Sequence, residues 1–357
     1  MISEEKKQNN ISNAAQSSDI TPSIINPDQT PDIRIAPMID WTDRHARYFL
    51  RLISPNVKLY TEMITCGALL HGDAERHLRF NNEEHPIALQ LGGASSEDLA
   101  TCTKMGTDYG YDEINLNCGC PSNRVQSGAF GACLMKDPER VADCMSAMSE
   151  STDKPVTIKC RIGVDDYDSY DFLTQFIEKT AQAGCTEFII HARKAWLNGL
   201  SPKENREVPP LRYDIVHQLK ADYPHIKFIL NGGITTLEQT SEQLSKLDGV
   251  MIGREAYQNP YFLSTLEHAI FKTESLLTRD EIALKMIDYA QRQHEQYQTP
   301  IKSITRHILG LYQGLPRSKR WRRTLSQAHK HPADHFDIIK EALDNMHSKD
   351  PNTCIAA

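Results

Sequence analysis

Two cysteines stand two positions apart in the stretch EINLNCGCPS, residues 113–122, after an alternation of apolar and polar residues. Cys118 and Cys120 could bind a metal, form a disulfide, or leave one thiol at the mouth of an active site. No second cysteine pair completes a zinc-ligand pattern, so the spacing disfavours a structural metal site. The nine cysteines are scattered through apolar segments, and in a reducing compartment they remain thiols. The third possibility, a reactive thiol, is therefore the one to test against the rest of the chain.

Other residues capable of chemistry occur at the ends of predicted strands. They are Met38 and Asp40, Gln90, Asn117 to Cys120, Lys159 and Arg161, His191 and Arg193, Asn231 to Gly233, and Gly253 with Arg254. Strands covered on both faces do not carry a lysine or histidine such as Lys159 or His191 without a partner. We therefore expect these residues to converge on one rim.

The glycines of this set have a specific physical use. In the NGG of residues 231–233 and at Gly253, backbone N–H groups can close on a phosphate. Arg254 would add a charge-assisted contact to the same phosphate. Each motif alone is weak, but together, after the last two strands, they predict a phosphorylated cofactor.

The elements that position these residues are eight β-rich runs, which begin 22 to 42 residues apart. They cover residues 33–39, 58–65, 86–92, 113–119, 155–163, 187–193, 227–234 and 249–256. The segments between them include helical patterns at 95–110, 137–150 and 169–184. Eight successive β-α units predict an α/β fold, a (β/α)8 TIM barrel, with a doubly wound open sheet as the alternative.

Domain limits follow from the same patterns. We expect a disordered tail over 1–32, the barrel over 33–270, a small helical domain over 271–347 and a C-terminal tail over 348–357. The net charge of −7 argues against a protein whose whole surface binds nucleic acid. With no membrane-length apolar run and no signal peptide, we expect a cytoplasmic protein without a membrane role. The final CIAA fits a prenylation pattern but lacks a polybasic neighbour, so lipidation is disfavoured.

A basic segment lies in the helical region. Residues 301–330 hold eight lysines or arginines and no acidic residue, with Trp321 among them. A run of charge is usually only a solvated helix face. The absence of acids and the interleaved aromatic residue favour contact with an RNA backbone, and Lys203 and Arg206 would extend this surface from the barrel rim.

The chain resembles the tRNA-dihydrouridine synthases, in particular their DusA subfamily. The resemblance covers about residues 33–345 and rests on stretches such as APMIDWTDRHARYFLR, YDEINLNCGCPS, HARKAWLNGLSPKENREVPPL, GVMIGREAYQNP and TRHILGLYQGLP. It implies FMN as cofactor, NADPH as hydride source, and reduction of the C5–C6 double bond of uridine in the tRNA D-loop, at positions 20 and 20a. No metal and no stable protein partner are implied.

The resemblance also assigns residues. The FMN positions are Ala36, Pro37, Met38, Gln90, Lys159, His191, Asn231, Gly232, Gly233, Gly253 and Arg254. Cys120, in the GCP motif, is the implied proton donor, and thiols, which ordinarily titrate near pH 8.5, carry a proton at neutral pH. Cys118 stands where relatives commonly have an apolar residue, so we expect it to be a small packing residue.

The tRNA-contacting positions implied by the resemblance are Asn117, Lys203, Arg206, Lys319 and Arg322. Lys319 stands where arginine is usual, which preserves a phosphate contact but not a bidentate one. Two other functions would share some of these features. A barrel flavoenzyme acting on a small molecule would have no use for the basic segment, and an RNA chaperone would not need Cys120 or the flavin residues.

Overall fold

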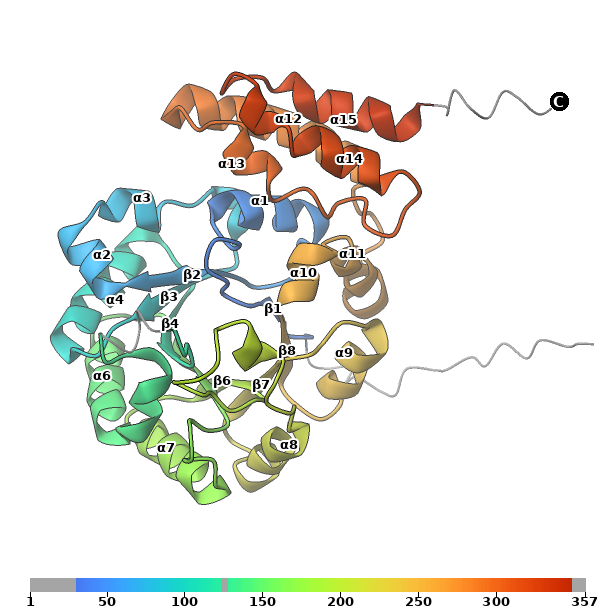
Figure 1. Ribbon diagram of the computed structural model, residues 1–357. Coiled ribbons are helices and arrows are strands. Elements are labelled where there is room, and N and C mark those ends of the chain that lie inside the picture. Colours follow the sequence, from blue (N-terminus) through green and yellow to red (C-terminus); the bar gives the residue numbers. More distant parts are fainter. Residues whose placement is uncertain (1–29, 123–127, 349–357) are drawn as a thin grey trace, which may run out of the picture.

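Eight parallel strands close into a barrel in the computed structural model, which describes residues 30–122 and 128–348 (Figure 1). The strands are β1 (Ile33–Ile35), β2 (Leu59–Thr65), β3 (Ile87–Gly92), β4 (Glu113–Cys118), β5 (Val156–Arg161), β6 (Glu187–His191), β7 (Lys227–Asn231) and β8 (Gly249–Ile252). Neighbours follow the order β1-β8-β7-β6-β5-β4-β3-β2. A parallel bridge between Arg34 and Lys58 joins β1 to the start of β2, with Lys58 N–H donating to the Ile33 carbonyl at 2.9 Å. The predicted (β/α)8 barrel is confirmed, and the open-sheet alternative is wrong.

Helices surround this barrel. They are α1 (Arg44–Ile53), α2 (Cys66–His71), α3 (Ala74–Leu78), α4 (Ser96–Tyr109), α6 (Pro138–Glu150), α7 (Tyr170–Gln182), α8 (Tyr213–Asp222), α9 (Leu237–Leu244), α10 (Arg254–Gln258) and α11 (Phe262–Leu266), with the π-helical turn η4 (Glu267–Phe271). Short 3₁₀ turns lie at η1 (Asn82–Glu84), η2 (Gly131–Lys136) and η3 (Glu204–Arg206).

The three helices predicted from capping and from the spacing of apolar residues are present. The Ser95 side chain accepts from the Asp98 N–H at the start of α4, which ends at Gly110 with a positive φ of 95°. Asp137 and Ser169 cap α6 and α7 in the same way.

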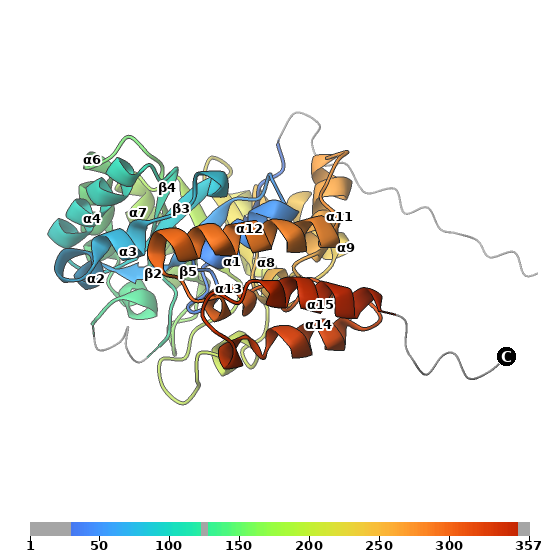
Figure 2. The ribbon, with the colours of Figure 1, turned by 90° about the horizontal axis from the view of Figure 1, so that it is seen from above.

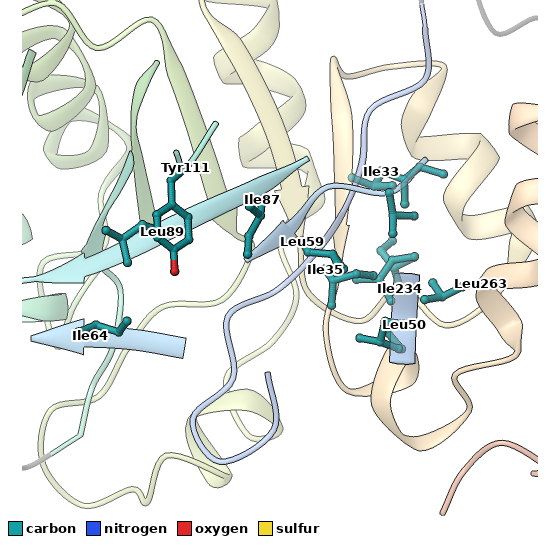
Figure 3. Packing of buried hydrophobic residues seen from close by; sticks show 14 of the residues in the cluster. Ile33, Ile35, Leu50, Leu59, Ile64, Ile87, Leu89, Tyr111, Ile234 and Leu263 are labelled. Carbon is teal, nitrogen blue, oxygen red and sulfur yellow. The ribbon is translucent and has the colours of Figure 1, made fainter. Parts of the chain in front are cut away.

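Side chains that point outward from the strands pack against the helices, and this layer forms the main core. Figure 3 shows Ile33 and Ile35 of β1 near Leu50 of α1 and Leu263 of α11. Inward side chains form a second, smaller cluster, composed of Ala36, Tyr60, Ala88, Ile189, Ile229 and Met251. The period-two alternation of a strand separates these two layers.

A buried ionic network fills the end of the barrel where the strands begin. Arg34 donates to Tyr60 at 2.9 Å and to Glu187 at 2.5 Å, and Lys58 donates to Glu113 at 2.7 Å. Because this end is filled, a ligand must enter from the opposite end, where the strands finish.

Further helices follow the barrel and gather on one side of it, next to α1 and α10 (Figures 1 and 2). They are α12 (Arg279–Tyr297), α13 (Lys302–Thr305), α14 (Ser318–Leu325) and α15 (Asp337–His347), with a 3₁₀ turn η5 (Ala328–Lys330). The rings of Tyr48 in α1 and Tyr289 in α12 stack with centroids 3.9 Å apart. The helical character predicted after residue 270 is confirmed. The N-terminal tail as far as residue 29 and the CIAA end lie outside the described residues.

No helix in the described ranges combines the length and apolar character needed to cross a bilayer.

Candidate active site

A cleft of about 520 Å³ opens at the ends of the strands. It brings together most of the residues that the sequence analysis singled out. Its lining includes Ala36, Pro37, Met38, Gln90, Asn117, Cys120, Lys159, His191, Arg206, Asn231, Gly232, Gly233, Gly253 and Arg254. Lys203, Lys319 and Arg322 are not part of this lining.

Cys120 stands on a turn that Asn117 holds in place. The Asn117 Oδ1 accepts from the Gly119 N–H at 3.1 Å and from the Cys120 N–H at 3.0 Å. The Cys120 thiol is half-buried and lies 3.5 Å from the Ser122 hydroxyl. Residues 123–127, which include the start of the VQSGAFGACLM stretch, lie outside the described residues.

The two cysteines lie in different environments, because Cys118 is the last residue of β4 and Cys120 lies on the turn beyond it. Asn117 points into the barrel, whereas Cys118 is fully buried in the outer core, paired in register with Cys160. Burial raises the pKa of the Cys118 thiol well above its usual value. Cys118 thus lies in an apolar layer, away from the cleft, as expected of a packing residue.

Arg161 joins this turn to the loop after β6. Its Nε donates to the Gly119 carbonyl at 2.9 Å, and its Nη1 donates to the carbonyls of Lys194 and Asn205, each at 3.0 Å. Arg161 is 3% exposed, so these contacts lie away from water. Burial lowers its pKa to about 10, and it remains charged at neutral pH.

Lys159 and His191 are two basic side chains that line the cleft, and Lys159 influences the protonation of His191. The Lys159 ammonium donates to Asn231 Oδ1 at 2.9 Å, and burial lowers its pKa to about 8. Burial, followed by repulsion from Arg161 and Lys159, lowers the pKa of His191 well below its usual value. The imidazole is therefore neutral at pH 7, with one nitrogen free to donate and one to accept.

The Gln90 amide is held in one orientation. Its Nε2 donates to Asn115 Oδ1 at 2.8 Å, and its Oε1 accepts from Asn117 Nδ2 at 2.8 Å. One amide hydrogen remains for a ligand in the cleft. Asn117, which is 7% exposed, uses both ends of its own amide within the protein; its predicted contact with tRNA stays a prediction.

The turn after β7 requires glycine. Gly232 has φ +117°, and a Cβ there would lie 2.8 Å from the His191 ring. Gly233 has φ +73°, and a Cβ there would lie 2.4 Å from Leu211. Glycine is therefore required because His191 and Leu211 occupy the space that a side chain would need, and both glycines line the cleft.

Arg254 lies across the cleft mouth and is paired with an acid. Its Nη1 contacts Glu207 Oε1 at 2.5 Å, and both side chains are more than one third exposed. A phosphate in the cleft would compete with Glu207 for this guanidinium.

Some basic side chains of residues 301–330 lie on α14, and another contacts the rim of the barrel. Lys319, Arg322 and Arg323 lie on one side of α14, spaced three and four residues apart, and the Arg322 guanidinium donates to Gln313 at 2.8 Å. Arg306 donates to the Asp40 carbonyl at 2.9 Å, which links this segment to the rim. In Figure 2 the yellow-green loop after β6 and helix α14 extend in the same direction along the barrel axis.

Trp321 differs from the prediction. It is fully buried, and its Nε1 donates to the Ile308 carbonyl at 2.9 Å. Because α14 packs this face inward, Trp321 is a core residue and offers no stacking surface to RNA.

Sequence reasoning did not identify Trp41 and Met63 as cleft residues, and it placed Arg161 on the rim without giving it a role. The ring of Trp41 stacks on Tyr257 with centroids 4.5 Å apart. Arg161 carried a signal, since it follows Lys159 by two residues and so shares its face of the strand.

Comparison with known proteins shows the family. The model of the family described as dihydrouridine synthase (Dus) matches residues 34–347. The chain belongs to the dihydrouridine synthase family. Dihydrouridine is uridine with two hydrogens added, so the chain is an enzyme of the oxidoreductase class.

Individual relatives carry a more specific name. A tRNA-dihydrouridine(20/20a) synthase of Shewanella oneidensis is 55% identical over 314 residues, covering 87% of this chain and 93% of the relative. Proteins with the same name from Vibrio cholerae and Escherichia coli (strain K12) are 53% and 54% identical, covering 95% and 90% of their own lengths. The resemblance read from the sequence to the tRNA-dihydrouridine synthases, in their DusA subfamily, is thereby confirmed.

Proposed function

We propose that the chain reduces the C5–C6 double bond of uridines 20 and 20a in the tRNA D-loop, with FMN as its cofactor and NADPH as the hydride source. The observation that carries this proposal is the single cleft that holds Cys120, Lys159 and the Gly232–Gly233 turn. The names of the relatives support the substrate. An enzyme that modifies tRNA would act in the cytoplasm.

The residues present fit FMN. Gly232, Gly233 and Gly253 line the cleft at the ends of β7 and β8, where their backbone N–H groups could hold a phosphate, and Arg254 supplies a cation there. The fixed Gln90 amide and the Lys159 ammonium offer donors for the polar edge of a flavin ring. When bound, the reduced flavin would supply a hydride to C6 of the uracil ring.

Cys120 would supply the proton that the reduction also requires. Addition of a hydride at C6 leaves a pair of electrons at C5, and a proton there completes the saturated ring. Cys120 would give its thiol proton to C5, because its turn holds it over the cleft and a thiol is protonated at neutral pH. Asn117 and Arg161 would hold the turn while the proton moves.

The tRNA would lie across the rim and α14. Lys203 immediately precedes the turn η3, and Arg206 is its last residue. Lys319 and Arg322 lie in α14. Phosphate contacts from these side chains would position the D-loop uridine over the cleft.

The test uses the purified full-length chain. Its visible spectrum should show a bound flavin, and incubation with NADPH and unmodified tRNA transcript should yield dihydrouridine in nuclease digests analysed by mass spectrometry. A flavin-bound protein that reduces a free pyrimidine but not tRNA would contradict the substrate. A colourless protein that FMN does not reconstitute would contradict the whole proposal.

A further inference from the structure

A second cleft, of about 260 Å³, lies outside the candidate active site. It is formed by the start of α1, the segment 79–83 before β3, and the last turns of α12, so the barrel and the C-terminal helices both contribute to it. Three arginines line it, Arg44, Arg79 and Arg292, together with Gln293 and Tyr297. None of these five residues lines the active-site cleft.

Two of the arginines gather around one aromatic ring. The Arg79 guanidinium lies 3.6 Å from the centre of the Tyr297 ring, and the Arg44 guanidinium lies 5.0 Å from it. Within the described ranges neither arginine forms an ion pair with an acid. Burial, and then repulsion from Arg79, lower the pKa of Arg44. An anion between the two guanidiniums would relieve this repulsion.

The acids near the cleft contact other basic side chains. Asp43 is engaged by His307 at 2.9 Å and by Arg306 at 2.6 Å. Glu83, on the rim, lies 4.0 Å from Arg292 and is about half exposed.

The cleft also contains unpaired polar atoms. Among the described residues, five buried side-chain polar atoms lack a hydrogen-bond partner, and three of them belong to residues of this cleft. They are the Nε atoms of Arg44 and Arg79 and the Oε1 of Gln293. Gln293 is 5% exposed, and its Nε2 donates to Asn81 Oδ1 at 3.3 Å. Unpaired buried groups are costly, so such a concentration points to a missing ligand.

We propose that this cleft is a second anion site that binds a phosphate ester next to a sugar hydroxyl. The guanidiniums of Arg44 and Arg79 would hold the phosphate oxygens, as planar guanidiniums do. The Oε1 of Gln293 lacks a donor, and an adjacent sugar hydroxyl supplies one. A ribose phosphate carries both groups. It can come from the backbone of an RNA or from a free sugar phosphate.

The experiment titrates the full-length protein with ribose 5-phosphate by calorimetry and with tRNA transcript by filter binding. The variants are Arg44→Gln and Arg79→Gln. The matched control is Arg76→Gln, an exposed arginine one turn before Arg79. Loss of one charged contact should weaken binding about tenfold or more. The control should stay within about twofold of the parent.

The two ligands distinguish the sources. If the source is RNA, both variants weaken tRNA binding and reduce its salt dependence by about one unit of slope. If the source is a free sugar phosphate, both variants lose binding of ribose 5-phosphate and retain binding of tRNA. Either pattern supports the site. Variants that match Arg76→Gln with both ligands overturn it.

A second measurement needs no variant. Phenylglyoxal modifies accessible arginines, and peptide mass mapping reports each position in the parent protein. We expect tRNA or ribose 5-phosphate to protect Arg44 and Arg79 but not Arg76. Equal modification of all three with and without either ligand overturns the proposal, whatever the folding of the variants. This site does not depend on the proposed reaction, because both measurements read binding alone.

Discussion

The Nε of Arg161 donates to the carbonyl of Gly119 at 2.9 Å, one residue before Cys120. The same guanidinium reaches two carbonyls of the segment 194–205. One buried cation therefore fixes the turn that carries the candidate proton donor relative to the loop after β6.

The first prediction concerns Arg161 itself. Arg161→Met leaves three carbonyls without their donor, and we expect it to lower the free energy of unfolding by about 2–4 kcal/mol. The Cys120 turn should also shift, lowering the turnover number by about 10–100-fold. Urea unfolding and single-turnover kinetics measure the two effects. Arg212→Gln, which removes an exposed arginine, is the control. If Arg161→Met turns over like the control, Arg161 does not position the turn.

The two cysteines give the second prediction. Cys120→Ala should retain FMN and its reduction by NADPH, while dihydrouridine formation falls about 10²–10⁴-fold, the usual contribution of a general acid. Cys118→Val replaces one buried apolar side chain with another of similar size and should keep near-parental turnover. Oxidation of reduced flavin by tRNA, followed in a single turnover, measures both. An inactive Cys118→Val beside a normal Cys120→Ala would reverse the assignment.

The Arg254–Glu207 pair gives the third. Arg254→Ala should weaken FMN binding about 10–150-fold, the value of one charged hydrogen bond. Glu207→Gln removes the acid that competes for Arg254, so FMN should bind as tightly as in the parent or more tightly. Quenching of FMN fluorescence gives both dissociation constants. A loss of affinity in Glu207→Gln would mean that the pair, rather than the free guanidinium, holds the phosphate.

The fourth concerns α14. The double variant Arg322→Gln with Arg323→Gln should bind tRNA with a higher apparent dissociation constant. The slope of log affinity against log salt concentration should fall by about two units. Flavin reduction by NADPH should be unchanged. A double control, Lys104→Gln with Arg140→Gln, removes equal charge from α4 and α6, on another side of the barrel (Figure 1). Equal salt slopes in the two double variants would rule out this surface.

The fifth is a pH dependence. Burial lowers the pKa of Lys159 from 10.5 to about 8, so between these values the unfolded chain holds a proton that the folded chain has lost. The folded state therefore becomes more stable as pH rises through this window, at most by about 1.4 kcal/mol per pH unit. Lys159→Met lacks this contribution, so the free energy of unfolding of the parent should rise relative to that of Lys159→Met between pH 7.5 and pH 10. Denaturant unfolding of both proteins measures it, and a constant difference would contradict the burial argument.

Local patterns in the sequence were sufficient to predict the barrel and the place of its chemistry. Strand periodicity and helix caps are local properties, and side chains at parallel strand ends must meet at one edge. Gln90, Lys159, His191 and Asn231 could therefore be assigned to one cleft before the fold was known. Alternation within β4 also places Cys118 on the face opposite Asn117, whereas Cys120 reaches the cleft because it lies on the turn beyond the end of the strand.

The partner of each side chain, in contrast, depends on how distant elements pack together. Trp321 stands among arginines in the sequence, but packing turns it into the core. Arg254 meets Glu207, 47 residues away, and Arg79 meets Tyr297 across the junction of barrel and helices. Such contacts depend on how distant elements pack, which no local pattern encodes. The second cleft exists for the same reason, since its walls come from three segments that only the folded chain brings together.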